Sequence, residues 1–266
     1  MSQSTVAKYF SLTWEMTKIN ILSAMEYRFS FWMLVFGMVV NDIGLLFIWV
    51  IFFQRFPEIN GWQFQDTVLL FSLSTMAFSL VMIFGGGAFE ISRKIRQGEL
   101  DYYLSFPKNI LWHCSISKTD ISAIGDFLFS IIIFFFSGDI NLSKVGLFLL
   151  MVLPSAAILF SFIVITQSLA FWIGDFEDGA YNLFHALLGF SLYPQSVFHG
   201  LLKLLMFTLL PAFFIVTLPV ELVKNFSLLN FAFLVTVAIG ITILAVKIFF
   251  AGLKKYESGN LINVKS

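Results

Sequence analysis

Long apolar segments separated by short polar ones make up most of this chain. The clearest apolar segments are residues 29–53, 67–88, 121–137, 145–173 and 228–253. A helix needs about 20 predominantly apolar residues to cross the hydrocarbon core of a bilayer. With a less regular apolar stretch between residues 180 and 220, the pattern predicts an all-α polytopic membrane protein with six transmembrane helices.

The stretch from residue 180 to residue 220 allows two interpretations. In one, residues 181–193 form the fifth span, and residues 195–220, interrupted by Pro211 and Pro219, form a re-entrant helical hairpin on the outer side before the last span. In the other, residues 201–218 are the span. Irregular backbone at membrane depth is tolerated only where protein or a water-filled cavity covers it. We favour the first interpretation, which places the hairpin beside any transport path.

Composition supports the membrane assignment. Hydrophobic residues make up 59% of the 266 residues and charged residues only 12%, which is too apolar for a water-soluble globule. Residues 1–28 mix charged and apolar positions and predict a helix lying in the membrane interface. We expect one permanently anchored domain over residues 1–266, without a cleaved signal peptide. The net charge of zero gives no reason to expect nucleic acid as a partner.

Residues 89–118 contain the most polar run between two spans. Arg93, Lys94 and Arg96 mark the point where the preceding helix leaves the lipid, and Gly98 can end that helix in a left-handed conformation. A second helix, residues 99–106, can begin at once. Such a short helix is unstable alone and must pack against something.

The side chains of this short helix are amphipathic. Glu99 and Asp101 fall in its first turn, where the helix dipole favours carboxylates. Leu100, Tyr103 and Leu104 follow on one side, at the i, i+3, i+4 spacing of a helix face. Pro107 ends the helix, because it disfavours helical backbone at the residue before it.

Lysine and arginine are distributed unevenly and predict the orientation. With a cytoplasmic N-terminus, the inner side carries twelve of the sixteen: Lys8, Lys18, Arg28, Arg93, Lys94, Arg96, Lys108, Lys118, Lys247, Lys254, Lys255 and Lys265. Such an excess marks the cytoplasmic side. We therefore expect both termini and residues 89–118 in the cytoplasm of a multi-pass protein of the cell membrane.

No pattern of catalytic or metal-binding residues is present. The three histidines are far apart, and the single cysteine, Cys114, excludes an internal disulfide. Residues 85–87 are three glycines, but no Gly-Lys-Ser/Thr follows, so we interpret them as a closely packed helix end rather than a phosphate loop. The acidic residues 175–178 could bind a metal, but we interpret them as the N-terminal cap of the next helix. We expect no enzyme activity, no metal and no cofactor on this chain.

Three polar residues lie within the predicted spans. Asn41 and Asp42 fall in the middle of the first span, and Asp126 lies in the inner part of the third. An ionisable side chain at such depth costs about 2.5–3.5 kcal/mol, so it must be paired or face a cavity. Asp42 could contact a substrate or hold helices together, whereas Asp126, beside Gly125, is better explained as a helix-packing contact.

Three motifs together resemble a known family. Residues 95–101, Ile-Arg-Gln-Gly-Glu-Leu-Asp, followed by Leu104 and Pro107, resemble the cytoplasmic loop of type-2 ABC transporter permeases. Residues 193–198, followed by Pro211 and Pro219, are similar to the proline-marked outer hairpin of these permeases, although His199 stands where a second proline is expected. Residues 256–260, Tyr-Glu-Ser-Gly-Asn, resemble the ending of one poorly characterised bacterial subfamily.

The resemblance implies a permease subunit of an ATP-binding-cassette exporter. Its partners would be cytoplasmic ATPase subunits and a second permease, either another copy or a sister protein. ATP and Mg would be bound by the ATPase, because this chain has no Walker motif. The short helix, residues 99–106, would be the coupling helix, and Gly98, Glu99, Leu100, Asp101, Tyr103, Leu104 and Pro107 would couple it to the ATPase.

Two other classes of protein compete with this interpretation. A secondary transporter or a channel would work without an ATPase, but such transporters show broken helices in matching halves and paired charges in the membrane. Here the broken segment occurs once. A membrane-embedded enzyme would need the catalytic pattern that is missing. The sequence does not indicate the substrate.

Overall fold

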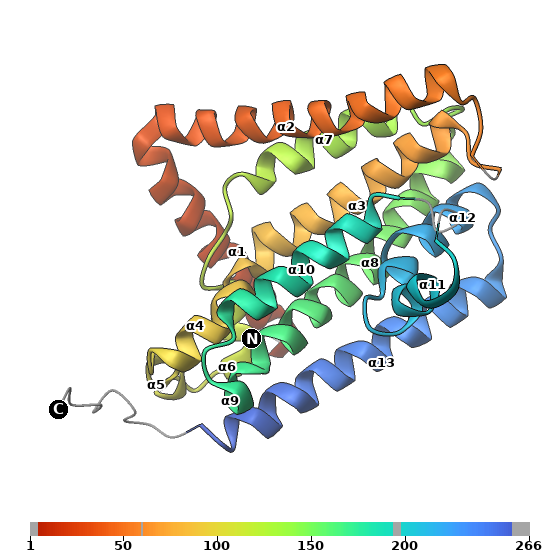
Figure 1. Ribbon diagram of the computed structural model, residues 1–266. Coiled ribbons are helices and arrows are strands. Elements are labelled where there is room, and N and C mark those ends of the chain that lie inside the picture. Colours follow the sequence, from red (N-terminus) through yellow and green to blue (C-terminus); the bar gives the residue numbers. More distant parts are fainter. Residues whose placement is uncertain (1–4, 60, 194–197, 257–266) are drawn as a thin grey trace.

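The computed structural model describes residues 5–59, 61–193 and 198–256, and this part of the chain is helical (Figure 1). The helices are α1 (Thr5–Ala24), α2 (Arg28–Arg55), α3 (Phe64–Gly85), α4 (Ile91–Arg96), α5 (Leu100–Leu104), α6 (Ile110–Ile116), α7 (Ala123–Phe134), α8 (Leu142–Ser168), α9 (Ala170–Ile173), α10 (Glu177–Ser191), α11 (Gly200–Phe207), α12 (Leu218–Lys224) and α13 (Leu228–Leu253). Short 3₁₀ segments, η1 (Met25–Tyr27) and η2 (Gly86–Glu90), and a π-helix, η4 (Phe213–Thr217), connect some of them.

Four continuous helical stretches are long and apolar enough to cross a membrane: Ala7–Arg55, Phe64–Arg96, Leu142–Ile173 and Leu228–Leu253. They agree with the first, second, fourth and last predicted spans. The other two predicted spans are shorter helices, with 12 residues in α7 and 15 in α10. In α7 the helix ends early because the chain turns before Gly138, which has a positive φ of 93°.

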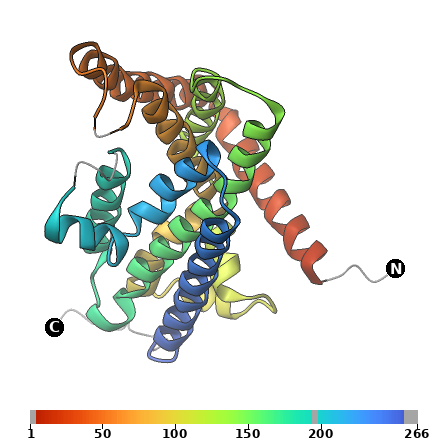
Figure 2. The ribbon, with the colours of Figure 1, turned by 90° about the vertical axis from the view of Figure 1, so that its right-hand side faces the viewer.

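The long helices lie side by side, with α3 and α8 at the centre (Figures 1 and 2). In their most apolar windows, 72% of the α3 segment and 56% of the α8 segment are buried, against 17% for the segment with α2 and 22% for α13. α7 packs between α3 and α2, and α13 packs on α8. The outward faces of α2 and α13 are therefore apolar and exposed, as expected for helices that face lipid.

A narrow stripe of side chains attaches α2 to the rest of the molecule. The buried residues of α2 are Phe31, Val35, Asp42, Trp49 and Phe53. The backbones of α2 and α7 approach closely at Gly125, where an added Cβ atom would collide with the carbonyl oxygen of Val35. Small residues allow such approaches between membrane helices.

The region between α10 and α13 is broken, as the two prolines predict. Pro211 lies between α11 and the π-helix, and Pro219 lies in the first turn of α12, where a missing N–H is tolerated. Of the hairpin predicted at residues 195–220, residues 195–197 lie outside the described part. The rest is two short helices and a π-helix, and Phe213–Val220 is buried. Of the tail motif, residues 257–260 also lie outside the described part.

Candidate functional site

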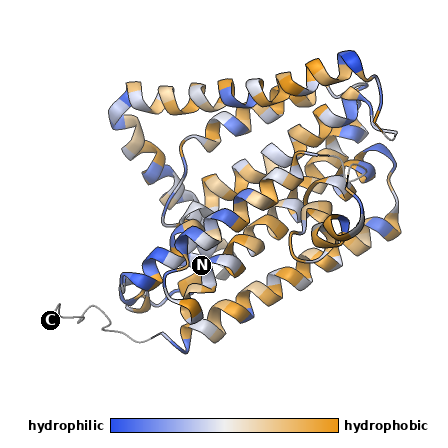
Figure 3. Ribbon diagram, in the orientation of Figure 1, coloured by the Kyte–Doolittle hydropathy of each residue, from blue (hydrophilic) through white to orange (hydrophobic). Residues whose placement is uncertain are grey.

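The segment from α4 to α6, residues 91–116, lies at one end of the helix bundle, where polar residues gather over α4 and α5 (Figure 3). α4 ends at Arg96, and Gly98 has a positive φ of 73°. The amide of Glu99 donates to the carbonyl oxygen of Lys94 at 3.0 Å, and that of Gly98 to the carbonyl oxygen of Ile95 at 3.3 Å. The predicted glycine stop is thus confirmed, and it turns the chain into α5.

Two of the three residues on the predicted apolar face of α5 pack against the chain itself. Leu100 and Tyr103 are 0% and 8% exposed and pack against Cys114 of α6, so they hold α5 to the chain itself. Only Leu104 of the predicted trio is exposed. Leu100 and Tyr103, at i and i+3, share the face that meets α6, and Leu104 falls at its edge.

The exposed large apolar side chains of this segment are Leu104, Trp112 and two residues that were not among the predicted coupling residues, Tyr102 and Phe106. The rings of Tyr102 and Phe106 contact each other edge to face, with centroids 4.9 Å apart. The sequence does contain an indication of this surface. Tyr102 and Phe106 have the i, i+4 spacing, and an aromatic pair at this spacing can form one surface at a helix end. Pro107 is also exposed, in the turn after α5.

Asp101 lies on the side of α5 that faces the end of α13. Its carboxylate neighbours Tyr256, and burial together with this neighbour raises the pKa of the Tyr256 phenol to about 12. Tyr256 also packs against the core cluster of Leu100 and Tyr103. The C-terminal end of α13 is therefore attached to α5.

Lys94 is buried and joins α4 to α6. Its Nζ donates to the Oγ of Ser117 at 2.8 Å and to the carbonyl oxygen of Gly87 at 3.3 Å, and it lies 3.5 Å from a carboxylate oxygen of Glu90. Glu90 also pairs with Lys118 at 2.7 Å. The sequence indicates Lys94 only as a stop signal, because burial of a lysine has no signature in the sequence.

Arg96 connects this segment to the turn before α10. Its Nη2 lies 2.8 Å from a carboxylate oxygen of Glu177, and its Nε lies 3.5 Å from Asp175. Glu177 and Asp178 fall in the first turn of α10, as predicted, although no side chain caps that helix. In the described part of the chain, no group of three His, Cys, Asp or Glu residues could hold a metal ion.

The N-terminal helix α1 also contacts this segment. The indole N–H of Trp112 donates to the hydroxyl of Thr13 at 3.1 Å, and the backbone N–H of Asn109 donates to the hydroxyl of Tyr9 at 3.2 Å. Asn20 donates from its amide to the hydroxyl of Thr119 at 3.3 Å. Thus α1, α4, α5, α6 and the end of α13 form one connected unit.

The three polar residues of the predicted spans, Asn41, Asp42 and Asp126, lie on α2 and α7, outside this unit, and two of them meet. Asp42 of α2 and Asp126 of α7 are 6% and 1% exposed, and their carboxyl groups lie close enough to interact. Asn41 is exposed and its amide contacts Asp42. The sequence marks all three residues as polar positions within spans, but it does not predict that the two acids form a pair.

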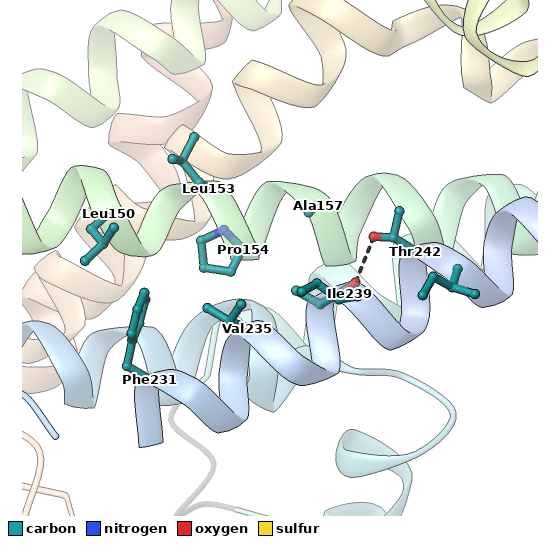
Figure 4. A pocket seen from close by; sticks show the side chains of 10 residues that line it. Leu150, Leu153, Pro154, Ala157, Phe231, Val235, Ile239 and Thr242 are labelled. Atoms are coloured by element: carbon teal, nitrogen blue, oxygen red, sulfur yellow. Dashed lines mark hydrogen bonds between the residues drawn. The ribbon is translucent and has the colours of Figure 1, made fainter. Parts of the chain in front are cut away.

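An apolar groove of about 410 Å³ lies on the surface between α8 and α13 (Figure 4). Leu150, Pro154, Phe231 and Ile239 are among the residues that line it. Its one polar side chain, Thr242, donates to the backbone oxygen of Ala238 at 2.7 Å. The groove therefore offers hydrocarbon contact and no free hydrogen-bonding group.

Comparison with known families decides the identity. Residues 39–259 match the profile of the ABC-2 family transporter proteins. The chain belongs to the ABC-2 transporter family. No curated protein and no solved structure matches it.

Membership explains the apolar helices, because proteins of the ABC-2 family are multi-pass membrane permeases that do no catalysis themselves and generally pair with ABC ATPases. The matched residues include the whole α4–α6 segment and both Asp42 and Asp126. They exclude α1, which is attached to the matched part through α6.

Proposed function

We propose that this chain is the permease subunit of an ATP-driven exporter and forms the translocation path of the complex. It works with separate cytoplasmic ATPase subunits, which bind ATP and Mg, and with a second permease, either another copy or a sister protein. The observation that carries this proposal is the α5 surface. A short helix presents Tyr102, Leu104 and Phe106 outward, while Leu100 and Tyr103 fix it to the bundle.

The exposed α5 surface has the composition of a protein contact. Aromatic side chains provide much of the binding energy at protein interfaces, and few residues account for most of it. The shape and charge of this surface are set by Gly98, Glu99, Asp101 and Pro107, which do not themselves fill a pocket on the ATPase. We therefore assign Tyr102, Leu104 and Phe106 as the anchor to the ATPase, and Leu100 and Tyr103 as the attachment that transmits its movement.

The connected unit of α1, α4, α5, α6 and the end of α13 can transmit a movement of α5 to the membrane helices. α4 continues from α3 through η2, α6 leads to α7, and Arg96 contacts the start of α10. Displacement of α5 by the ATPase would therefore act on three helices of the bundle. Packed helices shift between discrete arrangements, which is how such a motion changes access to a path.

For the topology, we propose six spans with both termini and residues 89–118 in the cytoplasm of the cell membrane. The shorter helices α7 and α10 are the third and fifth spans, residues 1–28 lie in the membrane interface, and residues 195–220 dip into the membrane from outside. The support is the basic residues on the inner side and the single-domain packing of the bundle around α3 and α8.

The orientation is tested with single cysteines and a membrane-impermeant thiol reagent on intact cells. Asn141→Cys and Asn225→Cys should be labelled, and Gln97→Cys should be labelled only after the membrane is opened. All three positions are exposed in the structure, so access depends on the side of the membrane. Labelling of Gln97→Cys in intact cells contradicts the proposed orientation.

Coupling is tested by the double variant Tyr102→Ala/Phe106→Ala. Removal of an aromatic anchor typically weakens the binding free energy of an interface by about 2 kcal/mol or more. The variant should therefore lose its ATPase on co-purification, although it should still insert normally into the membrane. It should also lose transport-dependent ATP hydrolysis in vesicles. The control is Phe226→Ala, which changes an exposed phenylalanine in the turn between α12 and α13. It should keep both ATPase binding and transport-dependent ATP hydrolysis. Normal binding and hydrolysis in the double variant would remove α5 from the mechanism.

A further inference from the structure

Two carboxylic acids meet in the contact between α2 and α7. Asp42 lies at the middle of α2, seven residues after Val35 and seven before Trp49 in the buried stripe of that helix. Asp126 lies in the first turn of α7, beside Gly125, where the backbones of α2 and α7 approach closely. The carboxyl groups of Asp42 and Asp126 lie close enough to interact with each other.

A hydrogen bond between two carboxyl groups requires a proton on one of them, because an ionised carboxylate can only accept. Besides each other, the groups that face the pair are the carboxylate of Asp120 and the amide of Asn41. In the described part of the chain, neither acid takes part in an ion pair with a lysine, arginine or histidine. Two neighbouring carboxyl groups in apolar surroundings cannot both stay ionised, because their negative charges repel each other.

The buried oxygen atoms of the pair support a bound proton. The Oδ2 atoms of Asp42 and Asp126 are buried and accept no hydrogen bond from a donor in the described part of the chain. A neutral carboxyl group tolerates such a site far better than a carboxylate, which needs several donors when it is buried. These surroundings therefore favour one protonated carboxyl group that donates a hydrogen bond and one carboxylate that accepts it.

We propose that Asp42 and Asp126 form a proton-binding pair that fastens α2 to α7. One carboxyl carries the proton and donates to the other, which accepts. The pair lies in the middle of a narrow seam, and the opposite faces of α2 are exposed. In the described part of the chain, no other side-chain hydrogen bond or ion pair joins α2 to another helix, so loss of this hydrogen bond leaves apolar contacts such as those of Val35 and Trp49.

The proton is detected by infrared spectroscopy of the protein in lipid vesicles at pH 7. A protonated carboxyl group gives a C=O stretching band that a carboxylate lacks. We expect this band to be lost in Asp42→Asn/Asp126→Asn, whose amides match the carboxyls in size. Asp120→Asn, which removes the neighbouring carboxylate, is the control and should keep the band. An unchanged band in the double variant overturns the bound proton.

The fastening role is tested separately by the distance between spin labels at positions 36 and 132, which are exposed on α2 and α7. Asp126→Asn keeps a hydrogen-bond donor toward Asp42 and should preserve the distance distribution of the parent protein. Asp126→Ala removes the bridge and should lengthen and broaden it. A distribution in Asp126→Ala identical to that of the parent protein overturns the fastening role, whatever the infrared result.

Discussion

The Nζ atom of Lys94 donates a 2.8 Å hydrogen bond to the Oγ atom of Ser117, and that hydroxyl in turn donates to the carbonyl oxygen of Cys114 at 2.7 Å. This chain of hydrogen bonds ties α4 to the end of α6. The side chain of Lys94 is only 3% exposed, so its charge depends on these partners and on Glu90. The end of the second long helix and the loop that follows are thus one rigid structure.

Replacing Lys94 by methionine should destabilise the protein. The substitution removes the donor that Lys94 supplies to the carbonyl oxygen of Gly87 and to the Oγ atom of Ser117, whereas the carbonyl oxygen of Cys114 keeps the Ser117 hydroxyl as its donor. A buried polar group left unsatisfied costs about 1–3 kcal/mol. Thermal unfolding in detergent measures the loss. Lys118→Met is the control, because Lys118 is exposed and its pair with Glu90 is worth at most about 1 kcal/mol. Equal effects of the two substitutions would contradict the structural role of Lys94.

Arg96 should matter more for coupling than for stability. Its pair with Glu177 is half-exposed, so Arg96→Glu should change the free energy of unfolding by about 1 kcal/mol or less. The two like charges should nevertheless separate α4 from the start of α10 and reduce transport-dependent ATP hydrolysis. The exchange Arg96→Glu/Glu177→Arg restores opposite charges and should recover activity. If the exchange is as inactive as the single variant, the pair does not transmit the movement.

The native cysteine should be inert to thiol reagents. Burial raises the pKa of the Cys114 thiol to about 12, although the nearby Lys94 acts in the opposite direction. Only the thiolate reacts, and its fraction grows as the pH rises toward the pKa. Maleimide should therefore not label Cys114 between pH 7 and pH 9, and should label it after denaturation. Tyr102→Cys, exposed in the same segment, should be labelled in the folded protein and serves as the control.

Local sequence rules predicted the parts of the structure that depend on neighbouring residues. The ends of the long helices, the stop at Gly98 and the break at Pro211 follow from hydrophobic periodicity and backbone preference. The family was also predicted, from the motifs in residues 95–107, 193–219 and 256–260 taken together, and the comparison confirms it. These features require no knowledge of which helices touch.

Contacts between distant residues were not predictable in the same way. The helical spacing of Leu100, Tyr103 and Leu104 indicated one apolar face, but not that α6 covers two of the three. The pairing of Asp42 with Asp126 depends on the packing of α2 against α7, which the sequence does not specify. The same is true of Lys94, whose partners come from η2 and α6.

The contact between α2 and α7 should be especially sensitive at Gly125. A Cβ atom there would collide with the carbonyl oxygen of Val35 and lie 3.0 Å from the Cβ of Met38, so Gly125→Ala must push the two helices apart. Overpacking of this kind typically costs about 1–3 kcal/mol, and thermal unfolding in detergent or vesicles measures it. Gly37→Ala is the matched control, because it lies on the exposed face of α2 with no atom within 4 Å of the added Cβ. That substitution should be neutral or slightly stabilising, since alanine favours helix over glycine by about 1 kcal/mol. If Gly125→Ala were as well tolerated as Gly37→Ala, α2 would not pack on α7 as the structure places it.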